Sequence, residues 1–147
     1  MTEKEPKQLR EIKPALVGYI RDSLVLLAQL PVPDDDAIHD IRVMMKKHRA
    51  AIRLVRPLLD EVVYNREYLA GRETGRILSS WRETAVLRKT ARALRKDNPG
   101  LFLKLWDNEQ IQSLLRKRYS SWEEAGVQAR AVSEVKDQLN RTNYRLR

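Results

Sequence analysis

Apolar residues recur every three or four positions through most of the chain, which is the period of an amphipathic helix. The first segment with this pattern carries its apolar side chains at Leu9, Ile12, Leu16, Tyr19, Ile20, Leu24 and Leu27. The spacing predicts a helix from about Gln8 to Leu30. Pro31 and Pro33 follow directly, and we expect them to end this helix because proline lacks the backbone donor that a helix needs.

A second helix is predicted from about Asp36 to Tyr64. Asp34, Asp35 and Asp36 stand at its start, where carboxylates cap free backbone N–H groups and interact favourably with the helix dipole. Pro57 lies inside the segment, and we expect it to kink or split the helix.

A third helix is predicted from about Glu67 to Lys96, and the sequence DNPG at residues 97–100 is a strong stop after it. Residues 101–147 predict one or two further helices. No segment alternates apolar and polar residues with the period of two that is typical of a strand, and no flexible linker divides the chain. The sequence therefore predicts one all-α domain over residues 1–147, an antiparallel helical bundle of four to five helices.

The second predicted helix carries a row of cations along one side. Over residues 38–59 the sequence is IHDIRVMMKKHRAAIRLVRPLL, and no acid lies among the Lys and Arg residues that follow Asp40. Successive residues of a helix are about 100° apart, which places six basic side chains within an arc of about 100°. These six are His39, Arg42, Lys46, Arg49, Arg53 and Arg56. Lys47 falls outside the arc. Beside the basic arc lies a stripe of apolar residues that is expected to face the core: Ile41, Met45, Ile52, Val55 and Leu59.

This row lacks the acidic partners that a solvated helix usually has. Cations three or four residues apart repel one another by about a few tenths of a kcal/mol, whereas a glutamate one turn away would stabilise the helix. The row therefore favours a negative charge supplied by a ligand or by another element. Its length, about 25 Å at roughly 1.5 Å per residue, suits an extended polyanion better than one phosphate. The alternative interpretation is an ordinary solvated face, since Lys and Arg are good helix formers.

The two histidines also have simpler interpretations. His39 stands near a helix start, where surface and capping roles are common. His48 falls in the core-facing stripe, where a satisfied core histidine is more common than a ligand. The two lie nine residues apart, on opposite sides of the helix, so they cannot chelate one metal ion together. The sequence predicts no metal site and no cofactor.

The composition also favours an anionic partner. The chain has 147 residues, with 29 Lys or Arg against 20 Asp or Glu and a net charge of +9. Such a charge favours nucleic acid, an anionic membrane or a phosphate polymer. The chain has no cysteine, its N-terminus lacks the apolar stretch of a signal peptide, and its longest apolar run is about half of what spans a bilayer. We therefore expect a cytoplasmic protein without a membrane partner.

The cationic row lies within a sequence that resembles a known signature. Residues 38–43 read IHDIRV, and residues 46–54 read KKHRAAIRL. They resemble the signature of the CHAD family, the conserved histidine α-helical domain. That signature is approximately Val-His-Asp-Leu-Arg-Val, two apolar residues, two basic residues, Leu-Arg, two small residues and Leu-Arg.

A second, weaker resemblance covers residues 78–87. Arg82 matches an arginine of the family, whereas Ser79 stands in place of a glycine and Glu83 in place of an aspartate. In the first segment, His48 stands where the family prefers leucine. Family members commonly have two similar four-helix halves, and this chain resembles the first half. A homodimer would rebuild a site with two halves, since a two-fold interface is the commonest kind in oligomers.

The resemblance implies an all-helical fold that binds inorganic polyphosphate and does not catalyse a reaction. Carried over position by position, it implies binding by His39, Arg42, Lys46, Lys47, Arg49 and Arg53, with Arg82 as a candidate from the third predicted helix. Arg56 continues the same row. A cytoplasmic location, in association with polyphosphate granules, is the corresponding expectation.

Further cations on the third predicted helix extend the candidate site. Arg82 and Lys89 are seven residues apart and share one helix face. Arg72 and Arg76 share another face, and we expect them to line the same groove. Lys89 belongs to a run of cations without acids at residues 88–96. The alternative interpretation of this run is a solvated helix end, where the dipole favours cations.

Three other functions are compatible with the sequence. A nucleic-acid-binding helical module fits the charge, but the sequence has no zinc motif and no convincing helix-turn-helix spacing. A scaffold for an acidic protein partner is the second alternative. An enzyme is the third, and it is disfavoured because the sequence has no HExxH motif, phosphate-binding loop or nucleophile motif.

Overall fold

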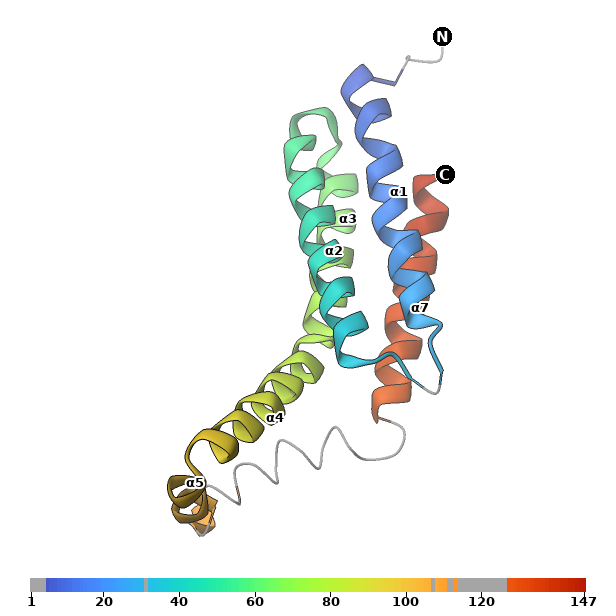
Figure 1. Ribbon diagram of the computed structural model, residues 1–147. Helices are drawn as coiled ribbons and strands as arrows, with labels where there is room; N and C mark the ends of the chain where they lie inside the picture. Colours follow the sequence, from blue (N-terminus) through green and yellow to red (C-terminus); the bar gives the residue numbers. More distant parts are fainter. Residues whose placement is uncertain (1–4, 31, 107, 111–112, 114–126) are drawn as a thin grey trace.

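The computed structural model describes residues 5–30, 32–106, 108–110, 113 and 127–147, and its regular elements are helices (Figure 1). The helices are α1 (Lys7–Leu27), α2 (Asp35–Leu54), α3 (Glu61–Ile77), α4 (Ser79–Asp97), α5 (Pro99–Trp106) and α7 (Val127–Leu146), with a short 3₁₀ turn at Arg56–Leu58. The predicted all-α fold is confirmed. None of these helices is both long and apolar enough to cross a membrane.

Four of the described helices form an antiparallel bundle. α2 packs against α1 on one side and α3 on the other, and α7 packs against α1 and α3 (Figure 1). The core between them is apolar, with fully buried side chains at Ile20, Ile38, Ile41, Met45, Val135 and Leu139. The apolar positions predicted to face the core on the first two helices, among them Ile20, Ile41 and Met45, are therefore buried in the bundle.

The start of α2 follows the predicted capping chemistry. The Oδ1 atom of Asp34 accepts a hydrogen bond from the backbone N–H of Ala37 at 2.7 Å. Asp35 and Asp36 occupy the first turn, where the helix dipole favours negative charge. This cap fixes where the cationic row begins, because His39 follows in the second turn of the same helix.

The predicted second helix is wrong beyond Leu54, where α2 ends. Pro57 lies in the 3₁₀ turn, and the carboxylate of Asp60 accepts from the backbone N–H of Val62 at 2.8 Å to cap a new helix. Tyr64 therefore belongs to α3, which runs antiparallel to α2. The proline was expected to kink or split the helix, and it accompanies a complete reversal of direction.

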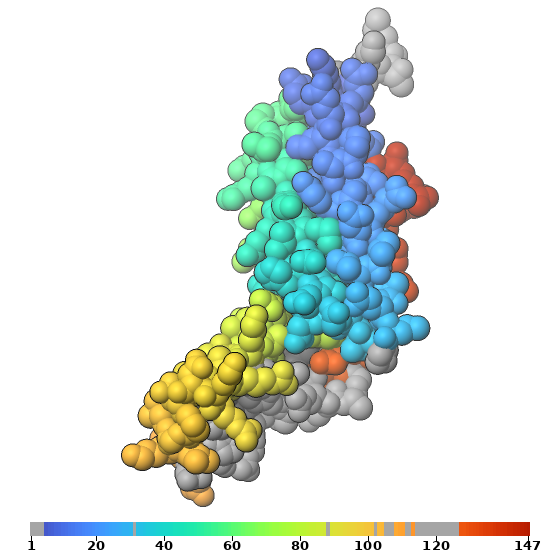
Figure 2. All heavy atoms as spheres, viewed as in Figure 1, coloured from blue at the N-terminus to red at the C-terminus, as the bar shows by residue number. Residues whose placement is uncertain are grey.

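The predicted third helix is also wrong, because α3 ends at Ile77 and α4 begins at Ser79. The break accompanies a change of direction, after which α4 leaves the bundle (Figures 1 and 2). Leu78 at the break is fully buried in the core, and Ser79 and Ser80 follow it. The indole Nε1 of Trp81 donates to Asp35 Oδ1 at 3.2 Å, which ties the first turn of α4 to the start of α2.

The stop predicted at residues 97–100 is confirmed, because α4 ends at Asp97 and α5 begins at Pro99. Proline is well suited to the first position of a helix, where its missing N–H group has no intrahelical partner to lose. The last described helix, α7, returns to the bundle and buries Ala131, Val135 and Leu139.

Candidate functional site

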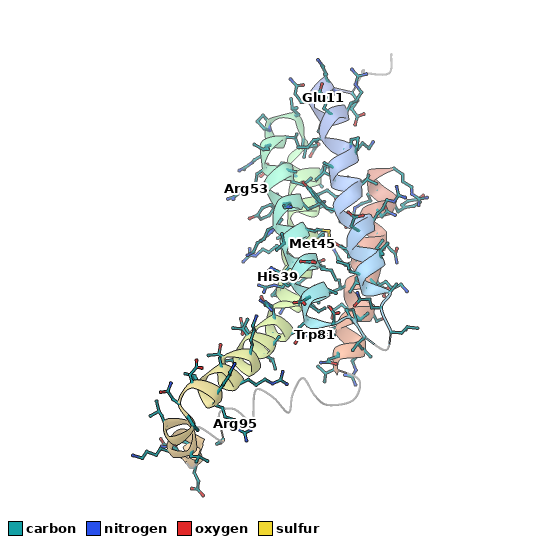
Figure 3. The ribbon with its side chains drawn as sticks, in the orientation of Figure 1. Glu11, His39, Met45, Arg53, Trp81 and Arg95 are labelled. Carbon is teal, nitrogen blue, oxygen red and sulfur yellow. The ribbon has the colours of Figure 1, made fainter. Side chains whose placement is uncertain are left out.

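Of the six basic residues predicted to share one side of the second helix, five lie on α2 and Arg56 lies in the 3₁₀ turn that follows it. We call His39, Arg42, Lys46, Arg49, Arg53 and Arg56 the cationic row. Figure 3 shows His39 and Arg53 along the same flank of α2. The side chains of Arg42 and Arg49 are partly buried, and the other four are exposed. The row continues past the end of α2 because Arg56 opens the 3₁₀ turn.

The first half of the row faces α4 across a hollow of about 440 Å³, which we call the cationic groove. His39, Arg42, Val43 and Lys46 line it from α2, and Arg82, Glu83, Val86 and Leu87 line it from α4. The groove exists because the break at Leu78 sends α4 across the start of α2. Arg42, Lys46 and Arg82 thus line one hollow from two helices.

Arg42, on α2, is held in position by α4. Its Nη2 atom donates a hydrogen bond to the Oγ atom of Ser79 at 3.2 Å, between α2 and the first turn of α4. A hydroxyl acceptor leaves the charge of the guanidinium intact and leaves most of its donors unoccupied. Ser79, which stands in place of a glycine in the signature, thus holds one cation of the groove without lining it.

The middle of the row lies against α3. A Cβ atom on Gly71 would come within 3.0 Å of Arg49 Cγ and within 3.2 Å of His48 Nδ1, so this glycine allows α2 and α3 to approach closely. The Nε atom of Arg49 is buried and has no hydrogen-bond partner among the described residues. A buried donor without a partner is costly, and the close approach of α2 and α3 at this point carries that cost.

The last part of the row lies over aromatic rings of α3. Arg53 Cζ is 5.8 Å from the ring centroid of Tyr68, and Arg56 Cζ is 4.7 Å from that of Tyr64. The two tyrosine rings are stacked, with centroids 5.6 Å apart. Sequence reasoning missed both tyrosines. Their spacing of four residues was the available signal, but their partners on α2 depend on how the two helices pack.

No carboxylate of the described chain forms an ion pair with the row. The described ion pairs are elsewhere, at Lys7–Glu11, Lys13–Glu5, Arg66–Glu67, Arg76–Glu73 and Arg145–Glu67. Glu83 lines the groove, but it stands on α4 beside Arg82 rather than on the row itself. The described structure therefore leaves the charge of the row without an acidic partner.

Several predicted site residues lie outside the groove. Lys47 lines a different hollow between α1 and α2, together with Asp22 and Asp40. Its position off the main arc explains this, since α2 presents it to the opposite flank. Lys89 is exposed on α4, two turns beyond Arg82 and on the same helix face.

Arg72 and Arg76 were expected to line the same groove, and neither is among its lining residues. The Nε atom of Arg76 lies 2.9 Å from an oxygen of Glu73 on its own helix. This hydrogen-bonded carboxylate raises the pKa of Arg76, and the arginine in turn lowers the pKa of Glu73. The charge of Arg76 is thus engaged on the outer side of α3.

His48 lies in the core, as predicted, but it is not satisfied there. It is fully buried, and neither ring nitrogen has a hydrogen-bond partner among the described residues. Burial disfavours the charged ring and lowers its pKa to about 4, and the nearby Glu67 carboxylate opposes this only in part. His48 is therefore a neutral core residue at neutral pH. Within the described ranges no cluster of three His, Asp or Glu residues could hold a metal ion.

Comparison with known proteins identifies a family. The chain matches the family described as the CHAD domain over residues 22–145, which includes α2, α3, α4 and nearly all of α7. No curated protein and no solved structure matches the chain. The matched region contains the whole cationic row and the groove between α2 and α4.

Proposed function

Because the chain belongs to the CHAD family, we propose that it binds inorganic polyphosphate along the cationic row. The observation that carries this proposal is the row itself. Five basic residues lie on α2 and Arg56 lies in the 3₁₀ turn after it, and no carboxylate of the described chain pairs with them. A polyanion would supply the missing negative charge.

The chemistry of the row suits a phosphate polymer. Polyphosphate presents oxygen acceptors at every repeat, and arginine makes bidentate contacts with such oxygens through its planar fork. Arg42, already oriented by Ser79, and Arg82 would contact the chain from opposite sides of the groove. Lys46 would add a point charge, and the exposed His39 would add a ring N–H donor. The row spans about 25 Å, so several consecutive phosphates could bind at once.

The proposal does not include catalysis. In this account the described side chains hold and neutralise the polymer, and none is assigned to break a phosphoanhydride bond. Incubation of the protein with polyphosphate and magnesium or manganese ions tests this directly. We expect no release of phosphate above that of the buffer, and a steady release that the purified protein catalyses would contradict the proposal.

We also propose that two copies form a homodimer in which two rows face one polymer. Lys46, Arg53 and Arg56 are exposed, so their outer sides remain accessible to a second copy or to a ligand. Sedimentation equilibrium with and without polyphosphate tests this part alone. A monomeric mass at micromolar concentration, with tight polyphosphate binding retained, would contradict the dimer and leave the binding function intact.

Competition with duplex DNA tests the choice of polymer. DNA is the relevant rival because the charge of the chain fits any polyanion. We expect calorimetric titration at physiological salt to give much tighter binding of medium-length polyphosphate than of DNA at equal phosphate concentration. Equal affinity for the two would indicate a general polyanion surface. If the protein prefers polyphosphate to DNA, the proposal extends to a cytoplasmic location at polyphosphate granules.

A further inference from the structure

The described arginines differ in how their guanidinium groups are held. Arg76 Nε lies 2.9 Å from an oxygen of Glu73, and Arg145 Nε lies 2.6 Å from Glu67. A carboxylate accepts from the N–H groups along the edge of the guanidinium and neutralises its charge. These arginines are therefore poorly available to a phosphate.

Arg53 and Arg56 are held in a different way. Their Cζ atoms lie 5.8 Å and 4.7 Å from the ring centroids of Tyr68 and Tyr64, and no described carboxylate pairs with either. An aromatic face attracts a cation through its quadrupole without neutralising the charge. The arginines thus keep both their charge and their donors while their side chains are restrained.

The rings that restrain them are themselves fixed. Tyr64 is buried in a core cluster with Leu16, Ala51 and Ile52, and Tyr68 packs against that cluster. The two rings are stacked with an interplanar angle of 20°. Because the core holds the first ring and the first ring holds the second, the pair forms a rigid support for the last arginines of the row.

We propose that Tyr64 and Tyr68 are positioning residues that hold Arg53 and Arg56 as a second phosphate-binding segment, separate from the cationic groove. This inference rests on the proposed function and deepens it. Arg53 lies seven residues beyond Lys46, or about 10 Å along the helix. The groove binds one part of the polymer, and the arginines supported by tyrosine bind the next part.

The physical benefit of the tyrosines is a lower ordering cost. Arginine is among the side chains that lose the most rotamer freedom when they are fixed. A side chain that is already restrained in the free protein loses less of that freedom on binding, which increases affinity without a new contact to the ligand. The tyrosines act on the polymer only through the arginines they hold.

A double-mutant cycle between Tyr68 and Arg53 tests this dependence. Affinity for medium-length polyphosphate is measured by calorimetry at one salt concentration for wild type, Tyr68→Leu, Arg53→Ala and the double variant. We expect Tyr68→Leu to weaken binding about threefold, a change within the range for the cost of fixing one long side chain on binding. In the Arg53→Ala background the same substitution should have no further effect, since the restrained group is already absent.

Two further variants separate positioning from general stability. Tyr68→Phe keeps the ring and should bind polyphosphate like wild type, whereas Tyr68→Met removes the ring and keeps an apolar side chain, and should behave like Tyr68→Leu. Urea unfolding and circular dichroism check that each variant is folded. A loss that is equal with and without Arg53, or no loss in either ringless variant, would overturn the inference.

The test also separates this inference from the proposed function. If wild type binds polyphosphate tightly but the cycle is additive, the positioning role fails and the binding function stands. If wild type shows no polyphosphate binding, the proposed function fails and this inference fails with it.

Discussion

The Cγ atom of Arg49 lies 3.0 Å from the place that a Cβ atom would take on Gly71. At this point α2 and α3 approach so closely that any side chain on Gly71 would meet the stem of a cation in the row. The contact links the packing of the bundle to the position of the proposed ligand-binding surface, because Arg49 cannot turn away from α3 without leaving the row.

Gly71→Ala should therefore weaken polyphosphate binding, by roughly the threefold to tenfold expected for disturbing one charged contact. A new Cβ would also meet His48 Nδ1 at 3.2 Å, so repacking should offset the gain in helix propensity of about 1 kcal/mol. Calorimetry and urea unfolding measure the two effects.

Gly75→Ala is the matched control, since it lies one turn along α3 with nothing within 4 Å of its added Cβ. It should stabilise the protein by up to about 1 kcal/mol and leave binding unchanged. If the two alanine variants bind and unfold alike, the close approach at Gly71 has no role in the site.

His48 should make stability fall in acid. The pKa of its ring is about 4 in the folded protein, below the ordinary histidine value of 6.5, so the unfolded chain takes up the proton first as the pH falls. The neutral ring makes its full contribution to the free energy of unfolding above about pH 6.5. This contribution falls progressively down to about pH 4, by roughly 3 kcal/mol in total. Urea unfolding between pH 7 and pH 4.5 measures this loss.

The His48→Leu variant should lose this part of the pH dependence. It should also be more stable at neutral pH by about 1 kcal/mol, because it removes two buried ring nitrogens that have no described partner. An unchanged acid loss in His48→Leu would show that other groups cause it.

The salt dependence of binding should report contacts of individual arginines. Each phosphate neutralised by the protein releases counterions, so the logarithm of affinity falls linearly with the logarithm of salt concentration. Arg42→Ala should reduce the magnitude of this slope by about one. Arg76→Ala removes the same charge from an arginine that is paired with Glu73, and it should leave the slope nearly unchanged. Identical slopes for the two variants would place Arg42 outside the contact surface.

The cationic row was predictable from the sequence because it depends on the helical period alone. The spacing from His39 to Arg53 places the side chains on one flank of any helix, whatever that helix packs against. The same angles correctly separated Lys47, which the structure places in a different hollow with Asp22 and Asp40.

The groove and the tyrosine support were not predictable in this way. The groove depends on the break at Leu78, where the chain has neither glycine nor proline and where the tertiary contact from Trp81 to Asp35 sets the direction of α4. The support depends on which residues of α3 lie opposite Arg53, and that register follows the reversal after Pro57. Both features arise from packing between helices rather than from the local sequence.

The most direct test of the central claim compares two triple variants of equal charge. The groove variant lacks three cations of the groove because it combines Arg42→Ala, Lys46→Ala and Arg82→Ala. The control variant lacks three exposed cations of α1 and α7 because it combines Arg10→Ala, Arg21→Ala and Arg141→Ala. Calorimetric titration with medium-length polyphosphate at physiological salt should show that the groove variant loses nearly all binding while it stays folded, and that the control variant binds almost as tightly as wild type. Equal losses in the two variants would mean that net charge, rather than the groove, accounts for binding.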